Sequence, residues 1–268
     1  AHFGRNYCGS GWARARVGNS PTRQYAVSSA PPSVPSPSLS PMPTSCHPRA
    51  LAWFRQQVPR IESTDGLLHA AMAIAMHALP DTDPAAVDQR LAKLAERVRQ
   101  GAPSGKIEAL LAHLHDVLFV AEKLEGNTDR YYLADNSYLP RVLETRRGLP
   151  ILLALIYKVV GSRASLQIDG INSPGHFLVR VLGDDGWMIV DPFFHGQVLT
   201  RDEAFDRLER VSGRPVPRDD RYLPVATHAE WISRILSNLQ SLFAAEGRQV
   251  DLAAMSELQH ELGDTLGT

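Results

Sequence analysis

A histidine and an aspartate at either end of a predicted hairpin are the residues best placed to do chemistry. His176 lies in the sequence PGHF and Asp191 in the sequence VDPF. A carboxylate that orients an imidazole and stabilises its charged form is the base-and-orienter arrangement of nucleophilic catalysis. The same pair can also serve the fold alone, as a half-buried histidine satisfied by a nearby acceptor. The spacing by itself favours the structural interpretation.

The turn between the two strands decides whether these side chains can meet. Apolar runs flank the sequence GDDG at 183–186, and Asp-Gly between such runs predicts a hairpin. A four-residue loop places His176 diagonally opposite Asp191, whereas a two-residue loop at 185–186 places Arg180 opposite Asp191. Both registers put the histidine and the aspartate on one face of the sheet, and only a three-residue loop would separate them.

A buried helix precedes the hairpin. Residues 151–160 are apolar on every side except at Lys158, and a helix that is apolar all round is buried rather than amphipathic. Pro150 suits its first turn. The run is too short for a bilayer, which needs about 20 apolar residues. We predict an α+β fold in which this central helix packs on an antiparallel sheet, with the His–Asp pair facing its N-terminus.

The motif blocks around this helix resemble a known family. NSYL and RRGLP before the helix, followed by PGHF and VDPF, are similar to the transglutaminase-like SirB family of bacterial proteins, from about Phe119 to Leu199. The resemblance implies a transglutaminase-like (papain-like) core followed by tetratricopeptide-like helices. It also implies a catalytic triad made of a Cys at the start of the core helix, a His on one strand and an Asp on the next. His176 and Asp191 match that His and that Asp.

The nucleophile that the resemblance implies is missing. Its position falls near 151–153, where Leu152 stands, and no Cys, Ser or Thr occurs in 149–160. Thiol chemistry requires a thiolate, which leucine cannot supply. We therefore interpret the chain as a non-catalytic transglutaminase-like protein, a pseudoenzyme that acts as a protein-binding or scaffold module. The alternative is a hydrolase or acyl-transfer enzyme that uses His176 and Asp191 as base and orienter on an amide or peptide substrate.

Other residues of the motif blocks are candidate binding groups. Asn136 can form a turn or line a cleft beside the His–Asp pair. Glu144 and Arg147 are three residues apart and could pair across one helical turn, which would cap and tether the core helix. Together with Leu152, at the position of the missing nucleophile, these residues make up the predicted binding site.

The sequence gives little support to metal, nucleotide or nucleic-acid binding. His176, Asp191 and His195 are suitable ligand types, but they come without a Cys cluster or an HxxxH motif, and no Gly-rich phosphate loop is present. We predict no metal and no cofactor. A net charge of −1 gives no case for a nucleic-acid or membrane partner. Two cysteines, Cys8 and Cys46, fit a reducing compartment, so we expect a cytoplasmic protein.

Residues 1–50 differ in composition from the rest. They contain five Arg and no Lys, Asp or Glu, so they carry +5 and the remainder −6. Pro and Ser dominate 31–48, which predicts a disordered tail. The segment fits an organellar transit peptide, a disordered basic tail, or translated upstream sequence with Met42 as the true start; we favour the last. It has no long apolar segment of the kind found in a Sec-type signal.

Helical patterns occupy 51–124. Asp83 followed by Pro84 is typical of a helix start, and Ser104 is a candidate cap for the next helix. With the motif region and a further helix that Thr200 should cap, these segments make up a transglutaminase-like domain over 51–212.

The C-terminal part predicts a pair of helices. Residues 228–245 carry one apolar stripe, and Asp251 is the expected cap of the last helix. We assign 224–268 to a tetratricopeptide-like helix pair. One such unit is too short to stand alone as a solenoid. We therefore expect it to pack onto the main domain or to offer its stripe to a partner, so that a protein partner binds the cleft or the C-terminal helices.

Overall fold

The computed structural model describes residues 44–266, and the segment Pro43–Thr268 forms one compact unit. The predictions for the tail over 1–50 and for a start at Met42 fall mostly on residues outside this range. The last part of the predicted tail is inside it and is helical, because the first helix begins at Pro48.

Helices make up most of the described chain. Their bounds are α1 Pro48–Gln57, α2 Thr64–Ala78, α3 Pro84–Gly101, α4 Ile107–His115, α5 Leu139–Thr145, α6 Pro150–Arg163, α7 Arg201–Ser212, α8 His228–Glu246 and α9 Gln249–Leu266. A π-helical stretch, Asp116–Ala121, continues α4. Within residues 44–266, no helix combines the length and the apolar character needed to cross a membrane.

The predicted helix starts are partly confirmed. Asp83 caps α3, and its carboxylate accepts a hydrogen bond from the Ala85 amide at 2.9 Å. Ser104 does not cap α4, whose N-cap is Lys106. Asp251 lies inside the first turn of α9 rather than at its cap, and its carboxylate pairs with Arg248 at 2.8 Å.

The strands form a five-stranded sheet in the order β6-β5-β4-β3-β7, and every neighbouring pair is antiparallel. A short parallel pair, β1 with β2, stands apart from it. The bounds are β1 Glu125–Gly126, β2 Arg147–Gly148, β3 Ile168–Ile171, β4 Leu178–Gly183, β5 Gly186–Asp191, β6 Gln197–Leu199 and β7 Val225–Ala226. The predicted α+β architecture with an antiparallel sheet is therefore confirmed.

The hairpin of β4 and β5 adopts one of the two expected registers. Val179 pairs with Val190, and the ladder closes at Gly183 and Gly186. This register is the one expected for a four-residue loop, with one further pair formed next to the turn. It places His176 and Asp191 on the same face, as predicted.

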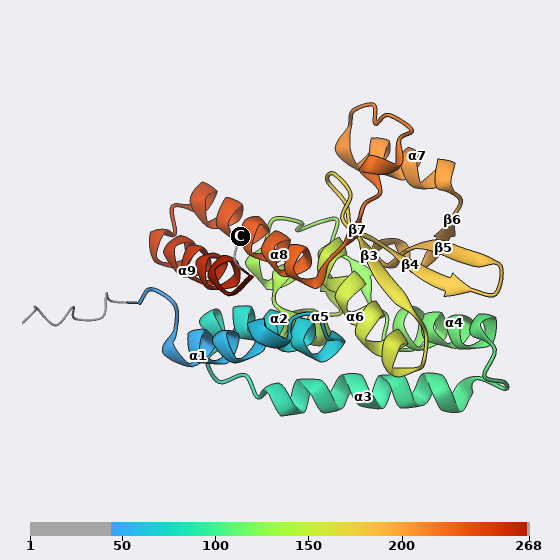
Figure 1. Ribbon diagram of the computed structural model, residues 1–268, viewed down its shortest axis with the longest axis horizontal. Helices are drawn as coiled ribbons and strands as arrows, with labels where there is room; N and C mark the ends of the chain where they lie inside the picture. The colour runs from blue at the N-terminus through green and yellow to red at the C-terminus, as the bar shows by residue number, and fades with distance from the viewer. Residues whose placement is uncertain (1–43, 267–268) are drawn as a thin grey trace, which may run out of the picture. The chain divides into compact units, whose positions relative to one another are not determined.

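Helix α6 runs between the sheet and the helices α2 and α3, as can be followed in Figure 1. It is buried from Pro150 to Gly161, which confirms the predicted core helix. Lys158 is buried with it, and its Nζ donates a hydrogen bond to the Ile168 carbonyl at 2.5 Å. The helix thus links the core to β3.

The C-terminal helices lie side by side, and they pack on α1 and α2 (Figure 1). The Trp231 indole, on α8, donates a hydrogen bond to the Ile151 carbonyl of α6 at 3.2 Å. Six of the seven residues of the predicted apolar stripe of α8 are buried in the main core, Trp231, Ile232, Ile235, Leu236, Leu239 and Phe243, whereas the seventh, Leu242, is only half-buried. The pair therefore packs onto the rest of the unit, the first of the two expected arrangements, and most of the stripe is covered.

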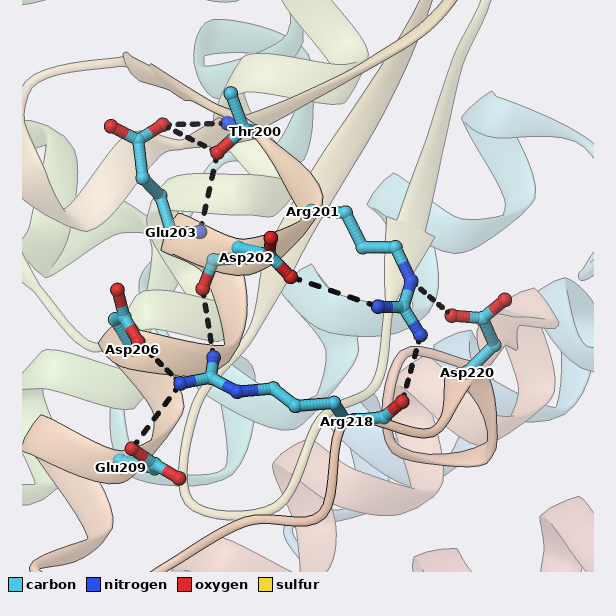
Figure 2. Close-up of polar contacts among 8 residues, drawn as sticks. All are labelled: Thr200, Arg201, Asp202, Glu203, Asp206, Glu209, Arg218 and Asp220. Atoms are coloured by element: carbon cyan, nitrogen blue, oxygen red, sulfur yellow. Dashed lines mark hydrogen bonds and ion pairs between the residues drawn. The ribbon is translucent and has the colours of Figure 1, made fainter.

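Helix α7 is held in place by charged groups. Thr200 and Glu203 form the capping box at its start. Figure 2 shows how Arg201 and Arg218 connect this helix to the segment that follows it. Arg201 pairs with Asp220 at 2.8 Å, and Arg218 donates a hydrogen bond to the Asp202 carbonyl at 2.9 Å. These exposed contacts join α7 to the residues that follow it, and α7 contributes directly to the candidate site.

Candidate functional site

His176 and Asp191 meet at the end of the hairpin. Nε2 of His176 lies 3.0 Å from Oδ2 of Asp191, and the two side chains are 1% and 0% exposed. Asp191 is the last residue of β5, and His176 stands in the turn just before β4. The geometry is that of an imidazole whose orientation is fixed by a carboxylate.

The turn that carries His176 needs a glycine. Gly175 has a φ of +72°, in the left-handed region that side chains rarely adopt. The His176 amide donates a hydrogen bond to the Ser173 carbonyl at 3.3 Å. The PGHF motif therefore has a local structural reason, because the Pro-Gly turn directs the histidine toward β5.

A third residue, Arg207 of α7, completes the cluster. Its Nη1 contacts Oδ2 of Asp191, and its Nη2 donates a hydrogen bond to Gln197 Oε1 at 2.6 Å. The guanidinium also lies over the Phe194 ring, 4.0 Å from its centre. Sequence reasoning missed Arg207. The signal was an arginine between Ala204 and Leu208 on the apolar face of a helix, where a charge requires a buried partner.

Asp191 is fully engaged. Oδ2 meets both His176 and Arg207, and Oδ1 accepts a hydrogen bond from the Phe193 amide at 3.1 Å. The buried guanidinium balances the charge of the carboxylate. The cluster therefore has a complete structural role, since it ties the His176 turn, the end of β5 and α7 to one point.

His176 also lines a pocket of about 770 Å³. The start of α6 forms the wall where the resemblance places a nucleophile, and this wall is apolar: Leu149, Pro150 and Ile151. Leu152 is 0% exposed and is not among the lining residues. Most of the remaining lining comes from the connector before α5, the rings that follow β5, and one face of α8: Thr128, Tyr131, Tyr132, Leu133, Ser137, Phe193, Phe194, Arg234, Asn238, Ser241, Leu242 and Ala245.

Asn136 supports this pocket from behind. Its Nδ2 donates hydrogen bonds to the carbonyls of Arg130 and Tyr131 at 2.7 and 2.9 Å, and its Oδ1 accepts one from Asn127 at 2.8 Å. The side chain is buried and belongs to none of the pocket walls. Of its two predicted roles, the contacts favour that of a turn former, and Asn136 thereby positions Tyr131 in the lining.

The predicted pair of Glu144 with Arg147 is wrong. Glu144 pairs with Arg141 at 2.7 Å, whereas Arg147 pairs with Glu125 at 2.7 Å. The reason is Arg146, whose φ of +65° ends α5, so that Arg147 belongs to β2 and no longer follows the helical spacing. Neither Glu144 nor Arg147 lines the pocket beside His176.

The geometry gives no metal-binding arrangement in the described residues. Nowhere in residues 44–266 do three His, Cys, Asp or Glu side chains gather in such a way. His195 adopts a φ of +56°, and its ring packs edge-on against Phe119, whereas His176 is bound to Asp191.

A buried helix whose start faces a His–Asp pair on an antiparallel sheet defines the transglutaminase-like class. The family model described as the transglutaminase-like superfamily matches residues 85–237. The chain belongs to this family, and with it to the bacterial UPF0162 proteins.

Several relatives support that assignment. A UPF0162 protein of Xylella fastidiosa is 37% identical over 192 residues, which cover 70% of this chain and 68% of the relative. The UPF0162 protein of Pseudomonas aeruginosa is 32% identical over 211 residues, 74% of this chain and 72% of the relative. Mouse F-box only protein 21 is 31% identical over 146 residues, 52% of this chain and 22% of the relative. No solved structure matches the chain.

Proposed function

We propose that this protein is a non-catalytic transglutaminase-like module that binds a protein partner through the pocket beside His176. One observation carries the proposal. The pocket wall at the start of α6 is formed by Leu149, Pro150 and Ile151, and Leu152 behind it is fully buried. A covalent mechanism needs an activated nucleophile within reach of its base, and this wall offers only hydrocarbon.

The buried cluster supports the same proposal. The carboxylate of Asp191 is shared between His176 and Arg207, so the aspartate balances a permanent cation besides orienting the imidazole. A buried pair of this kind holds elements together whether or not chemistry occurs beside it. Because most of the apolar stripe of α8 is buried, the proposal assigns the partner to the pocket, to which α8 contributes one wall.

One observation favours a second candidate, a hydrolase or acyl-transfer enzyme acting on an amide or peptide. His176 lines the pocket, its orienting bond to Asp191 is 3.0 Å long, and Ser137 belongs to the same lining. A base that activates water would need no cysteine.

Three expectations stay predictions from the sequence: the SirB assignment, the tetratricopeptide-like nature of the C-terminal pair and the cytoplasmic compartment.

The two candidates differ in what happens to the partner. The full chain and its His176→Gln variant are immobilised side by side, partners are captured, and the intact mass of each captured protein is measured before and after prolonged incubation. A binding module returns the partner with unchanged mass. A partner that is cleaved or acylated by the wild-type chain and left intact by His176→Gln would overturn the proposal and establish the enzyme.

A further inference from the structure

Arg234 brings a positive charge into the pocket, and it has no carboxylate partner in the described part of the chain. Its Nη1 donates hydrogen bonds to the Ser173 carbonyl at 2.6 Å and to Asn172 Oδ1. Within residues 44–266 these are its only hydrogen bonds and it forms no ion pair, so Nε and Nη2 keep their donor capacity. The other arginine of this region, Arg207, is neutralised by Asp191.

The position of this cation has a physical cost. Burial lowers the pKa of Arg234, and the hydroxyl of Tyr131 opposes this shift. A guanidinium does not deprotonate in proteins, so the charge persists in the pocket. A half-buried cation that finds no anion among residues 44–266 is poised to bind an anion from outside.

The face of α8 that carries Arg234 is polar. Asn238 and Ser241 follow at helical spacing and line the same pocket. The Ser241 hydroxyl is engaged with the Ser237 carbonyl at 2.9 Å. The Asn238 amide makes no hydrogen bond within the described part of the chain, so it offers a donor and an acceptor to a peptide group.

Aromatic rings adjoin the cation. The guanidinium carbon of Arg234 lies 5.8 Å from the centre of the Phe177 ring. Phe193 and Phe194 stack edge to face at 5.1 Å, and Tyr131 meets Phe193 at 6.3 Å. The pocket therefore places one cation beside an apolar wall, and its volume of about 770 Å³ falls within the ~300–1,000 Å³ range of pockets that enclose a small ligand.

We propose that this pocket binds the C-terminal carboxylate of a partner polypeptide, with Arg234 pairing the carboxylate and the aromatic wall receiving the last side chain. The inference rests on the proposed binding function and specifies its ligand. A chain end carries a carboxylate and a side chain on one carbon, which matches a cation that adjoins an apolar wall. The guanidinium has the planar fork geometry that binds carboxylates, and the Asn238 amide is placed to pair with the preceding peptide group.

The test uses a short peptide as the probe. Acetyl-Gly-Gly-Phe with a fluorine label on the ring is titrated against the full chain as the free acid and as the C-terminal amide, and binding is followed by fluorine NMR. A third peptide, acetyl-Glu-Phe-amide, carries its carboxylate on a side chain. We expect the free acid to bind at least about tenfold more tightly than either amide.

Matched variants locate the contact. Arg234→Gln should bring the acid and the amide to within about twofold of each other, whereas Arg234→Lys should keep part of the preference because it keeps the charge. Arg221→Gln is the control, since Arg221 is exposed and paired with Asp219 at 2.8 Å, and it should leave the preference unchanged. Thermal unfolding of each variant checks that it is folded.

Three results would overturn the inference. The wild-type chain could bind the free-acid peptide and its C-terminal amide equally, or bind neither peptide up to about 5 mM. Alternatively, acetyl-Glu-Phe-amide could bind as tightly as the free-acid peptide. The first two need no variant, so they stand even if Arg234→Gln misfolds. A partner that is captured equally well by wild-type chain and Arg234→Gln would overturn this inference and leave the proposed binding function intact.

Discussion

Arg207 forms a buried ion pair with Asp191, and their side chains are 5% and 0% exposed. The pair joins α7 to the end of β5, and the same oxygen of Asp191 holds His176. The position of the histidine at the pocket therefore depends on a helix that begins ten residues after the aspartate. This relationship makes the cluster a structural support of the pocket, and it has measurable consequences.

Removing Arg207 should destabilise the fold strongly. In Arg207→Met the carboxylate of Asp191 stays buried without its cation, and losing one partner of a buried pair costs about 3–5 kcal/mol. Urea denaturation followed by circular dichroism measures the free energy of unfolding. Arg218→Met is the control, because Arg218 is an exposed arginine of the same region that pairs with Asp206, and it should cost at most about 1 kcal/mol.

The double variant Arg207→Met with Asp191→Asn tests the coupling. Once the aspartate is neutral, the missing cation leaves no uncompensated charge. We expect the double variant to lose less stability than the two single losses added together, by about 1–3 kcal/mol. Strict additivity would show that the two residues act independently, contrary to the structure.

The parts of this fold that could be predicted are those set by local pattern. The apolar run of α6, the GDDG turn and the Thr200 cap of α7 each lie within a short stretch of sequence, and each forms as expected. The face shared by His176 and Asp191 follows from the hairpin register alone. These features depend on neighbours in sequence, which a single chain reveals.

The rest of the site depends on how distant elements dock. Arg207 reaches Asp191 only because α7 packs beside β5, and nothing in its own helix specifies that partner. Arg234 and Asn238 lie on the polar side of an amphipathic helix, where the pattern predicts solvent rather than a pocket. The expected pair of Glu144 with Arg147 failed because one residue, Arg146, left the helical conformation. Helical spacing carries no information beyond the end of its helix.

Gly126→Ala should disturb the pocket from outside it. A Cβ at Gly126 would lie 2.5 Å from the Phe193 ring, and that ring is buried and packs edge-on against His176 at 5.8 Å. We expect a loss of about 1–3 kcal/mol in the free energy of unfolding. Gly105→Ala is the matched control, since a Cβ there meets nothing within 4 Å, and it should change stability by less than about 0.5 kcal/mol. Equal effects would contradict the packing described for Phe193.

Lys158→Met should stabilise the protein. Burial lowers the pKa of Lys158 from its usual 10.5, so the unfolded chain binds more protons between the two pKa values and stability rises with pH across that window. At a pH below both pKa values, the folded chain bears the full cost of burying the charged ammonium group. Replacement by an apolar side chain of similar length should raise the free energy of unfolding at pH 7 by about 1 kcal/mol.

The gain from Lys158→Met should also depend on pH. It should shrink as the pH approaches 10.5, where the unfolded wild-type chain loses its proton as well. Denaturation curves at pH 7 and pH 10 measure the difference. Lys93→Met, at an exposed position of α3, should show neither the gain nor its pH dependence. A destabilised Lys158→Met at both pH values would mean that the bond to the Ile168 carbonyl outweighs the cost of burial.

The acid stability of the fold should depend on His228. Burial lowers its pKa below the usual 6.5, and its Nδ1 lies 2.8 Å from the Ile61 carbonyl. Because the folded pKa lies below the unfolded one, the stabilising contribution is complete above pH 6.5 and is lost as the pH falls from there toward the folded value. His228→Asn places an amide donor near the position of Nδ1 and removes the titration, so the stability of this variant should fall less between pH 7 and pH 5.

His260→Asn, at a side chain that is 75% exposed, is the control and should keep the wild-type pH profile of stability. Parallel wild-type and His228→Asn profiles would assign the acid sensitivity to another group, for which His115 is the next candidate because burial lowers its pKa too.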